Sequence, residues 1–276
     1  MRKLLAAAMA AVLSFSAFGY SVAEAGSLEG SVAFIKASGT LRNCIDPEFQ
    51  PEIYLKDGKP AGLAADLADA MAASLGVKVT YVQTNFAGLI AGLQANKCDI
   101  ALSGVTARAK RAESATFAKN YLLLVLGLAV KASETRTEIA DFNKPGVKIC
   151  IVEGTSDDAA FKAAFPQAQS VALQDVNSCF LQLATGKVDG FIVDNSTGAT
   201  YGTKHSDQIK MQFIANGGLQ SVPSAIAVRY GDTELRDWVN VFLSEYIDSG
   251  SYAALYVKNY ESQPDIQQLK ISRGGF

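Results

Sequence analysis

A short stretch of the chain combines residue types that can bind a small polar molecule. The sequence CDIALSGVTARAKRAESATFAKNY, residues 98–121, runs from an apolar segment into SGVT at 103–106. Three cations follow at Arg108, Lys110 and Arg111. Taken alone, Arg111 is most simply interpreted as a solvated cation in the first turns of a helix. Its neighbours favour a second interpretation, in which hydroxyl groups, a glycine and a guanidinium lie together at the end of a buried strand.

Three other apolar runs also end in polar residues. They end at Asp46, at the Gly-Thr-Ser segment 154–156 and at Asp194. In doubly wound α/β sheets, ligands bind beyond the carboxyl ends of the strands. The four polar strand ends fall two in each half of the chain, and together they predict a shared cleft.

The sequence offers little for catalysis or for metal binding. It contains no GxSxG, GxxxxGK[ST], HExxH or GxGxxG motif and no CxxC pair. Its single histidine, His205, lies in the polar segment GTKHSDQ and is expected at the surface. The formal net charge of −2 gives no reason to expect a nucleic-acid partner. We therefore expect a protein that is not an enzyme and that has no cofactor or metal ion.

The elements that must position these residues alternate between strand and helix. Leu63, Leu67, Met71 and Leu75 recur every four residues, as on one face of an amphipathic helix. The expected order is a strand at 39–46, a helix at 62–75 stopped by Gly76, a strand at 77–82, a short helix ending near Asn96 and a strand at 99–103. This order predicts an α/β fold with parallel, doubly wound sheets.

A weak internal echo indicates two similar lobes. The segments 89–104 and 179–194 each read as an apolar helix, a turn containing Lys-x-Asp and a buried strand. Aligned together, they place Asp99 opposite Asp189. A further helix is predicted near the C-terminus, capped by Asp232 and ended by Gly250, from the spacing of Leu235, Trp238, Val239, Phe242, Leu243, Tyr246 and Ile247.

The first 25 residues are typical of a cleaved signal peptide. A basic start at Arg2 and Lys3 is followed by an apolar run to about Phe18 and by Ala-Glu-Ala at 23–25. Export would expose the cysteines to an oxidising compartment, where two disulfides are plausible. The cysteines are Cys44, Cys98, Cys150 and Cys179. Three pairings are possible, and four buried free thiols remain the alternative.

Six motifs, in order, make the chain resemble the family-3 extracellular solute-binding proteins, the polar amino-acid receptors of bacterial ABC importers. The resemblance runs from about residue 38 to 262. The segments that carry it are LRNCIDPEF, GLAADLADAMAASLGVKV, LSGVTARAKR, IVEGTS, LATGKVDGFIVD and GDTELRDWVNVFLSEYIDSGSYAALYVKNY. It implies a two-lobe periplasmic-binding-protein fold of type II, with an amino acid bound between the lobes.

The resemblance also implies a role for each polar residue of the cleft. Arg111 corresponds to the arginine that grips the ligand α-carboxylate, although Arg108 could compete with it. Thr106 would donate its hydroxyl, and the backbone of Ser103 and Gly104 would lie against the ligand.

From the other lobe, Thr155 and Ser156 would begin a helix whose free N–H groups attract an anion. The next two residues, Asp157 and Asp158, are expected to face water and to complement the helix dipole. Asp194 corresponds to the carboxylate that pairs with the α-ammonium group, and an N-cap of the next helix is its alternative role.

The remaining correspondences concern the ligand side chain. Phe49 matches an aromatic residue that lies over the ligand, and Phe86 matches another aromatic residue of the cleft. Ala64 stands where most members have an aspartate that some basic-amino-acid receptors use, and this weakens lysine, arginine or ornithine as the ligand. Asp46 remains as a carboxylate that could meet a polar or cationic side chain.

The resemblance divides the chain into a signal peptide (1–25), a first lobe (26–121 plus 230–276) and a second lobe (122–229). The hinge is expected near Tyr121–Gly127 and Ala225–Arg229. Cys44–Cys98 and Cys150–Cys179 disulfides fit this division because each would stay within one lobe. We expect a monomer in the periplasm whose partners are an amino acid and an ABC transporter membrane permease. The alternative is a cyclohexadienyl-dehydratase-like enzyme on the same fold.

Overall fold

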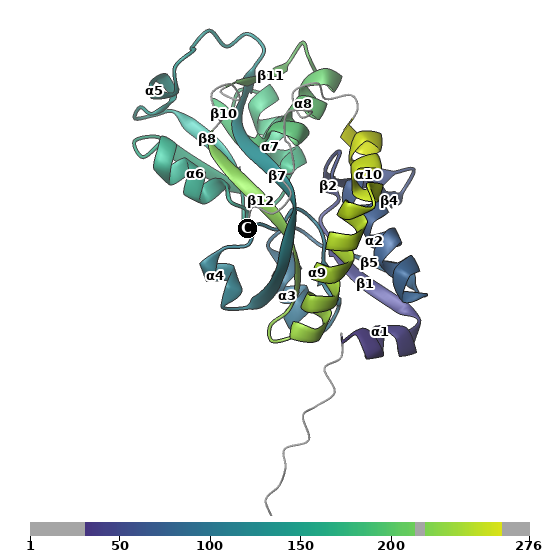
Figure 1. Cartoon of the computed structure of the whole chain (residues 1–276). Helices are drawn as coiled ribbons and strands as arrows, with labels where there is room; N and C mark the ends of the chain where they lie inside the picture. The colour runs from purple at the N-terminus through teal and green to yellow at the C-terminus, as the bar shows by residue number, and fades with distance from the viewer. Residues whose placement is uncertain (1–30, 213–218, 261–276) are drawn as a thin grey trace, which may run out of the picture.

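The computed structural model describes residues 31–212 and 219–260 (Figure 1). The expected signal peptide lies outside the described residues, as do 26–30, 213–218 and 261–276 of the expected lobes. Among the helices of the two described ranges, none is long and apolar enough to cross a membrane.

A nine-stranded sheet forms the centre of the molecule. Across the sheet its strands are β5 (Lys78–Gln83), β1 (Thr40–Ile45), β6 (Ile100–Ala101), β12 (Gln220–Arg229), β7 (Ala115–Lys131), β10 (Gly190–Asp194), β8 (Lys148–Val152) and β9 (Gln169–Leu173), while β11 (Ile209–Gln212) pairs with β7. β1 runs parallel to β5 and β6, and β8 runs parallel to β9 and β10. Each of these two parallel groups belongs to one half of the molecule, which we call the first half (β5, β1, β6) and the second half (β10, β8, β9).

Two long antiparallel strands join the halves. β7 and β12 pair with each other along most of their length, and β12 also pairs with β6 while β7 pairs with β10. The register between β7 and β12 shifts on either side of Ala225. Both segments expected to form the hinge lie in these strands, which run between the upper and lower parts of Figure 1. The sequence predicted a parallel sheet in each lobe. In the structure, the antiparallel pair of β7 and β12 joins the two parallel groups into one continuous sheet.

Helices flank both halves. The first half carries α1 (Val32–Ser38), α2 (Leu63–Leu75), α3 (Gly88–Gln94), α4 (Ala109–Ala112) and a small sheet of β2 (Glu48–Phe49), β3 (Ile53–Lys56) and β4 (Lys59–Ala61). The second half carries α5 (Ile139–Phe142), α6 (Asp157–Ala164), α7 (Val176–Ala184) and α8 (Asn195–Lys204). The C-terminal helices α9 (Thr233–Asp248) and α10 (Ser251–Tyr260) return to the first half, where α9 packs on β7 and α10 on α2.

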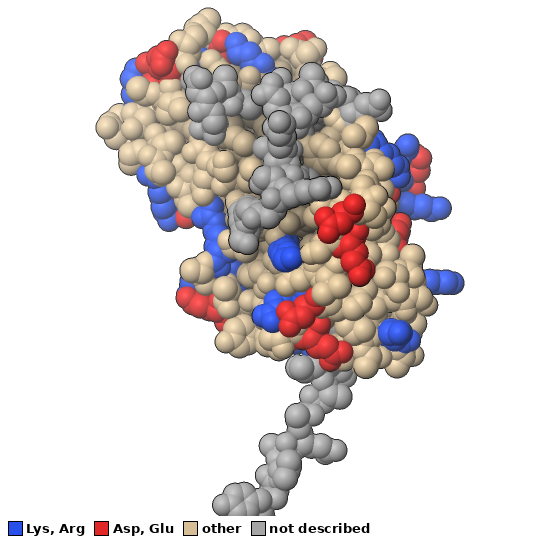
Figure 2. Space-filling model, in the orientation of Figure 1, with Lys and Arg blue, Asp and Glu red and all other residues tan. Residues whose placement is uncertain are grey.

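The predicted amphipathic helices form for the expected reasons. The apolar positions of α2 are buried, and Gly76 ends the helix in the left-handed conformation with φ of 72°. In α9 the Asp232 side chain accepts a hydrogen bond from the Leu235 backbone N–H and so caps the helix. Acidic side chains gather on the solvent side of the first half, around α9 (Figure 2).

Both expected disulfides are present, so the alternative of free thiols is wrong. Cys44–Cys98 joins β1 to the turn before β6, with Cα atoms 5.6 Å apart. Cys150–Cys179 joins β8 to α7, with Cα atoms 5.7 Å apart. Each bond therefore stays within one half of the molecule.

Candidate functional site

A cavity of about 40 Å³ lies between the two halves, where strand ends from both sides meet. Its first-half wall includes Gly104, which follows β6, and its second-half wall includes Thr155 and Asp194, which follow β8 and end β10. The predicted site residues that line it are Phe49, Phe86, Gly104, Thr106, Thr155, Ser156 and Asp194. Asp46, Ser103 and Arg111 do not line it.

The loop after β6 forms much of the first-half wall. Gly104 adopts a φ of +70°, and its backbone N–H donates to the Tyr121 hydroxyl at 3.1 Å. The Ser156 hydroxyl of the second half donates to Thr106 Oγ1 at 3.4 Å. Phe49 and Phe86 pack edge to face, with ring centroids 5.6 Å apart. This wall thus combines hydrogen-bonding groups with two aromatic rings.

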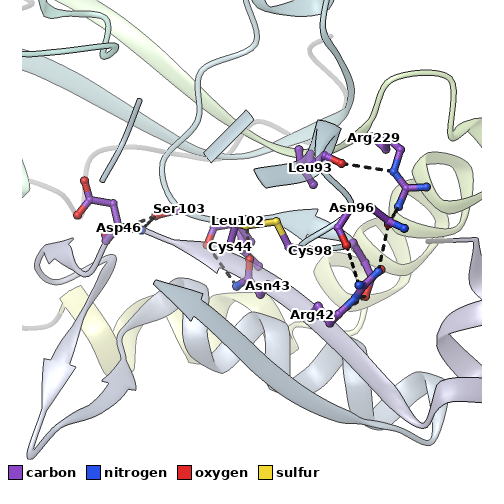
Figure 3. The surroundings of a disulfide bond; sticks show 11 residues. Arg42, Asn43, Cys44, Asp46, Leu93, Asn96, Cys98, Leu102, Ser103 and Arg229 are labelled. Carbon is purple, nitrogen blue, oxygen red and sulfur yellow. Dashed lines mark hydrogen bonds and ion pairs between the residues drawn. A yellow bond between two sulfur atoms is a disulfide. The ribbon is translucent and has the colours of Figure 1, made fainter. Parts of the chain in front are cut away.

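Ser103 and Asp46 hold the strand ends together instead of lining the cavity. The Asp46 backbone N–H donates to Ser103 Oγ at 2.9 Å, close to the Cys44–Cys98 disulfide (Figure 3). The Asp46 side chain is only 3% exposed, and its Oδ2 atom has no hydrogen-bond partner within the described ranges. Burial, helped by the charge of Glu48, raises the pKa of Asp46 to about 7.

Arg111 lies beside a neighbouring, larger cavity of about 240 Å³, which also has Phe86 in its wall. Its Nη1 donates to the Thr106 carbonyl oxygen at 2.8 Å, and its Nη2 donates to the Gly154 carbonyl oxygen at 2.5 Å. The second of these hydrogen bonds joins the two halves. Arg111 and Asp194 therefore do not line the same cavity. Burial, followed by repulsion from Arg108, lowers the pKa of Arg111 to about 10.

Asp194 both caps a helix and borders the cavity. Its Oδ1 accepts hydrogen bonds from the backbone N–H groups of Ser196 and Thr197, at 3.0 and 2.9 Å, and from the Ser196 hydroxyl. The side chain is nevertheless part of the cavity wall. The alternative role of N-cap is thus real, and all of these capping bonds reach a single carboxylate oxygen.

Two carboxylates of the wall were missed by sequence reasoning. Glu52 is 2% exposed, and its Oε1 accepts a hydrogen bond from the Tyr121 hydroxyl. Burial is the largest cause that raises its pKa to about 7, and the charge of Asp194 adds to the rise. No sequence periodicity marks Glu52, which sits between the short strands β2 and β3.

The expectation that Asp157 faces water is wrong. It is 5% exposed, lines the cavity and accepts a hydrogen bond from the Val152 backbone N–H at 3.2 Å. Burial raises the pKa of Asp157 to about 7. The position of Asp157 directly after the predicted ligand residue Ser156 was the sequence signal that could have placed it in the cavity wall. Asp158 is exposed, as expected, and pairs with Lys162.

Further hydrogen bonds join the two halves. Lys204 Nζ donates to Gln50 Oε1 at 2.7 Å, and Asn85 Nδ2 donates to Gln174 Oε1 at 2.7 Å. Across the described ranges, no group of three or more His, Cys, Asp or Glu residues is arranged to hold a metal ion. The arrangement is therefore suited to enclosing a small molecule between two halves and contacting it with acidic, hydroxyl and aromatic groups.

Comparison with known proteins agrees with this geometry. The family model of bacterial extracellular solute-binding proteins, family 3, matches residues 41–262. A probable histidine-binding protein of Campylobacter jejuni is 26% identical over 80% of this chain and 85% of its own. A cyclohexadienyl dehydratase of Pseudomonas aeruginosa is 27% identical over 58% of this chain and 61% of its own. The crystal structure of an ancestral amino acid-binding protein, a precursor of cyclohexadienyl dehydratase, has a TM-score of 0.75 at 31% identity and covers 83% of this chain and 99% of its own.

Proposed function

The chain belongs to the bacterial extracellular solute-binding proteins of family 3, and on this premise we propose that it captures an amino acid between two lobes and delivers it to an ABC importer. The observation that carries the proposal is the cavity whose wall is built by both halves and contains Asp194. A carboxylate there can pair with the α-ammonium group of an amino acid. A buried ammonium group needs such a partner, since an uncompensated charge costs several kcal/mol, roughly.

Ligand entry requires the halves to separate. A cavity of about 40 Å³ has room for a few water molecules, whereas an amino acid is larger. Separation would break the hydrogen bond from Arg111 to the Gly154 carbonyl and free the guanidinium for the α-carboxylate. Arg111 lies one cavity away from Asp194, and Phe86 borders both cavities. The two cavities would then become one cleft.

The two moving bodies are a first lobe of residues 26–121 plus 230–276 and a second lobe of 122–229. Support comes from β7 and β12, which contain the crossing segments 121–127 and 225–229. Bending there would change the angle between the halves while each half keeps its own core. Small-angle scattering with and without ligand measures this closure.

The working form is a monomer in the periplasm, and its partner is a membrane permease pair of the importer. Removal of residues 1–25 as a signal peptide leaves a mature chain that begins at Gly26. Intact-mass measurement of protein recovered from the periplasm tests the cleavage, and a mass that includes residues 1–25 would contradict it.

A thermal-shift screen over the amino acids tests the function. A ligand that binds only the folded state raises stability by mass action, by about 2.7 kcal/mol at a hundred times Kd. We expect at least one amino acid to raise the melting temperature, with calorimetry confirming one bound molecule. A screen in which no amino acid shifts melting would overturn the proposal.

The protein acts by binding, without turnover, but one observation favours a second candidate. Glu52 and Asp157 are buried cavity carboxyls with raised pKa, and such groups can serve as general acids near neutral pH. A cyclohexadienyl dehydratase on this fold would need an acid of this kind. Incubation with prephenate or arogenate decides between the candidates: product formation that Glu52→Gln or Asp157→Asn abolishes would favour the enzyme.

A further inference from the structure

Three carboxyl groups line the cavity wall, which is more than the single ammonium group of a neutral amino acid can pair with. Glu52, Asp157 and Asp194 all line the cavity. Within the part of the chain that the structure describes, none of them takes part in an ion pair. Lys110 and Arg111 border the neighbouring cavity instead. A zwitterionic ligand brings one ammonium group, which the proposed function assigns to Asp194.

Glu52 is held rigidly at this wall. Its Oε1 accepts the hydrogen bond of the Tyr121 hydroxyl, which itself accepts from the Gly104 backbone N–H. A Cβ atom added to Gly104 would lie 3.0 Å from Glu52 Oε2, so the carboxylate is packed against the loop that lines the cavity. A carboxylate has about four acceptor positions, and the tyrosine occupies one of them. Acceptor positions thus remain for a ligand.

The groups that face Glu52 leave its charge uncompensated. They are Tyr121 of β7, the Gly104 amide, Asp194 of β10 and the Tyr252 and Tyr260 hydroxyls of α10, none of which carries a positive charge. The Tyr260 hydroxyl is also buried and has no hydrogen-bond partner within the described ranges. A positive group in the cavity would stabilise the ionised carboxylate, since an opposite charge nearby favours the charged form.

Apolar residues of the wall can pack against the aliphatic part of a ligand side chain. Leu124, Leu126 and Val222 of the joining strands line the cavity beside the carboxylates. The alanine at position 64, which was expected to weaken cationic ligands, is fully buried in the core and does not line the cavity. Its identity is therefore no argument against a cationic side chain at Glu52.

We propose, on the premise of the proposed function, that Glu52 makes the site selective for amino acids with a cationic side chain. The distal ammonium or guanidinium group binds Glu52, the aliphatic stem packs on the leucine and valine side chains, and the α-ammonium group binds Asp194. Glu52 is thus the specificity-determining residue of the site.

Calorimetry with matched ligands tests this assignment. L-Lysine is compared with L-norleucine, and L-arginine with L-citrulline, because each pair differs chiefly in the side-chain charge. For the wild-type protein we expect at least one cationic ligand to bind about 100-fold more tightly than its neutral match. Glu52→Gln should reduce that ratio to below about fivefold and leave the affinity for the neutral match within about threefold. Glu48→Gln, which alters a neighbouring glutamate outside the cavity wall, should preserve the ratio.

Each other outcome overturns the assignment or its premise. Equal affinity of the wild-type protein for charged and neutral matches overturns it, and this comparison needs no variant if Glu52→Gln fails to fold. An equal loss for all ligands in Glu52→Gln also overturns it, because the residue would then act only through Tyr121 and the packing. Binding of neutral amino acids alone overturns the assignment and leaves the proposed function intact. Binding of no amino acid overturns the proposed function itself.

Discussion

Arg111 directs its guanidinium to two carbonyl oxygens, one from its own loop at Thr106 and one from the opposite half at Gly154. A carbonyl oxygen is a neutral acceptor, and a ligand carboxylate would replace it with a charge-assisted, bidentate partner. The ring of Phe86, 5.4 Å from the guanidinium carbon, lies between this position and the acidic cavity. At the residue scale, the cation and the carboxylates thus line different cavities, although Arg111 and Asp157 lie close enough to interact electrostatically.

Arg111→Ala should weaken amino-acid binding by about 100-fold or more, since removing one partner of a buried charged pair costs roughly 3 kcal/mol. Arg108→Ala is the matched control and should change the affinity by less than about fivefold. Calorimetry with the ligand found in the thermal-shift screen measures both. If Arg108→Ala caused the larger loss, the assignment of the clamp would pass to Arg108.

The buried carboxyls predict how stability depends on pH. Burial raises the pKa values of Asp46, Glu52 and Asp157 in the folded protein to about 7, from ordinary values near 4. Between pH 4 and pH 7 these three carboxyl groups keep protons in the folded protein that they have released in the unfolded chain. The stabilising contribution of the three groups is therefore complete below pH 4 and is lost as the pH rises through 7.

The melting temperature should therefore fall between pH 5 and pH 8. Glu52→Gln should make that fall smaller, because a glutamine does not titrate. Asp158→Asn, which changes the exposed neighbour of Asp157, should leave the fall unchanged. Differential scanning calorimetry of the three proteins measures these differences, and an identical pH dependence in Glu52→Gln and wild type would contradict the role given to Glu52.

At the scale of elements, the weak sequence echo reflects a repeated structural device. Asp99 accepts a hydrogen bond from the Arg42 backbone N–H at 2.8 Å, at the beginning of a parallel strand pair in the first half. Asp189 accepts one from the Lys148 backbone N–H at 2.9 Å in the second half. Each aspartate also pairs with an arginine, Asp99 with Arg42 and Asp189 with Arg136. The Lys-x-Asp turn thus fixes the same strand register twice.

The two aspartates should differ in their contribution to stability. The Asp99 side chain is fully buried, whereas that of Asp189 is 38% exposed. Asp99→Ala should lower the free energy of unfolding by about 2 to 3 kcal/mol, because the buried carboxylate also accepts the Arg42 backbone N–H. Asp189→Ala should lower it by about 1 kcal/mol. Urea unfolding followed by circular dichroism gives both values, and equal losses would contradict this ranking.

The sequence predicted well those elements whose pattern is local. The four-residue recurrence in α2, its end at Gly76 and the capping of α9 by Asp232 each depend on neighbours within one or two turns. Seven of the fifteen residues that line the cavity were also predicted, because the carboxyl ends of parallel strands meet at one edge. Glu52 was not, since its burial depends on Tyr121, 69 residues away. The spacing of residues in the sequence also could not predict which of the two cavities beside Phe86 Arg111 would line.

At the scale of the whole molecule, one contact between the halves limits how closely they can approach each other. Gly154 of the second half lies against Ala87 of the first, and a Cβ atom at Gly154 would be 3.0 Å from the Ala87 Cα atom. Such a distance is shorter than nine in ten real Cβ contacts. The Ala87 atoms that the added Cβ would meet belong to the backbone and to a short side chain, so they can move little. The observed closure therefore depends on a glycine at this position.

Gly154→Ala should hold the halves apart and weaken ligand binding by about tenfold. Gly146→Ala is a matched control, because Gly146 also has a positive φ, 88°, but a Cβ atom there would meet nothing within 4 Å. Both variants should lose about 1 kcal/mol of stability from backbone strain. Only Gly154→Ala should show a larger radius of gyration by small-angle scattering in the presence of ligand. A tenfold loss of affinity in both variants would assign the effect to strain.

The return of α9 and α10 to the first half has a consequence for the order in which the chain can fold. Lys258 and Asn259 of α10 bond to Asp66 of α2, and the Tyr252 hydroxyl donates to the Tyr121 carbonyl oxygen. A polypeptide emerges with its N-terminus first, so the half that begins synthesis is completed only by the residues made last. The strands and helices of the second half, from α5 to α8, lie between residues 139 and 204 and are made much earlier. The contacts that α9 and α10 make with the first half can therefore form only at the end of synthesis.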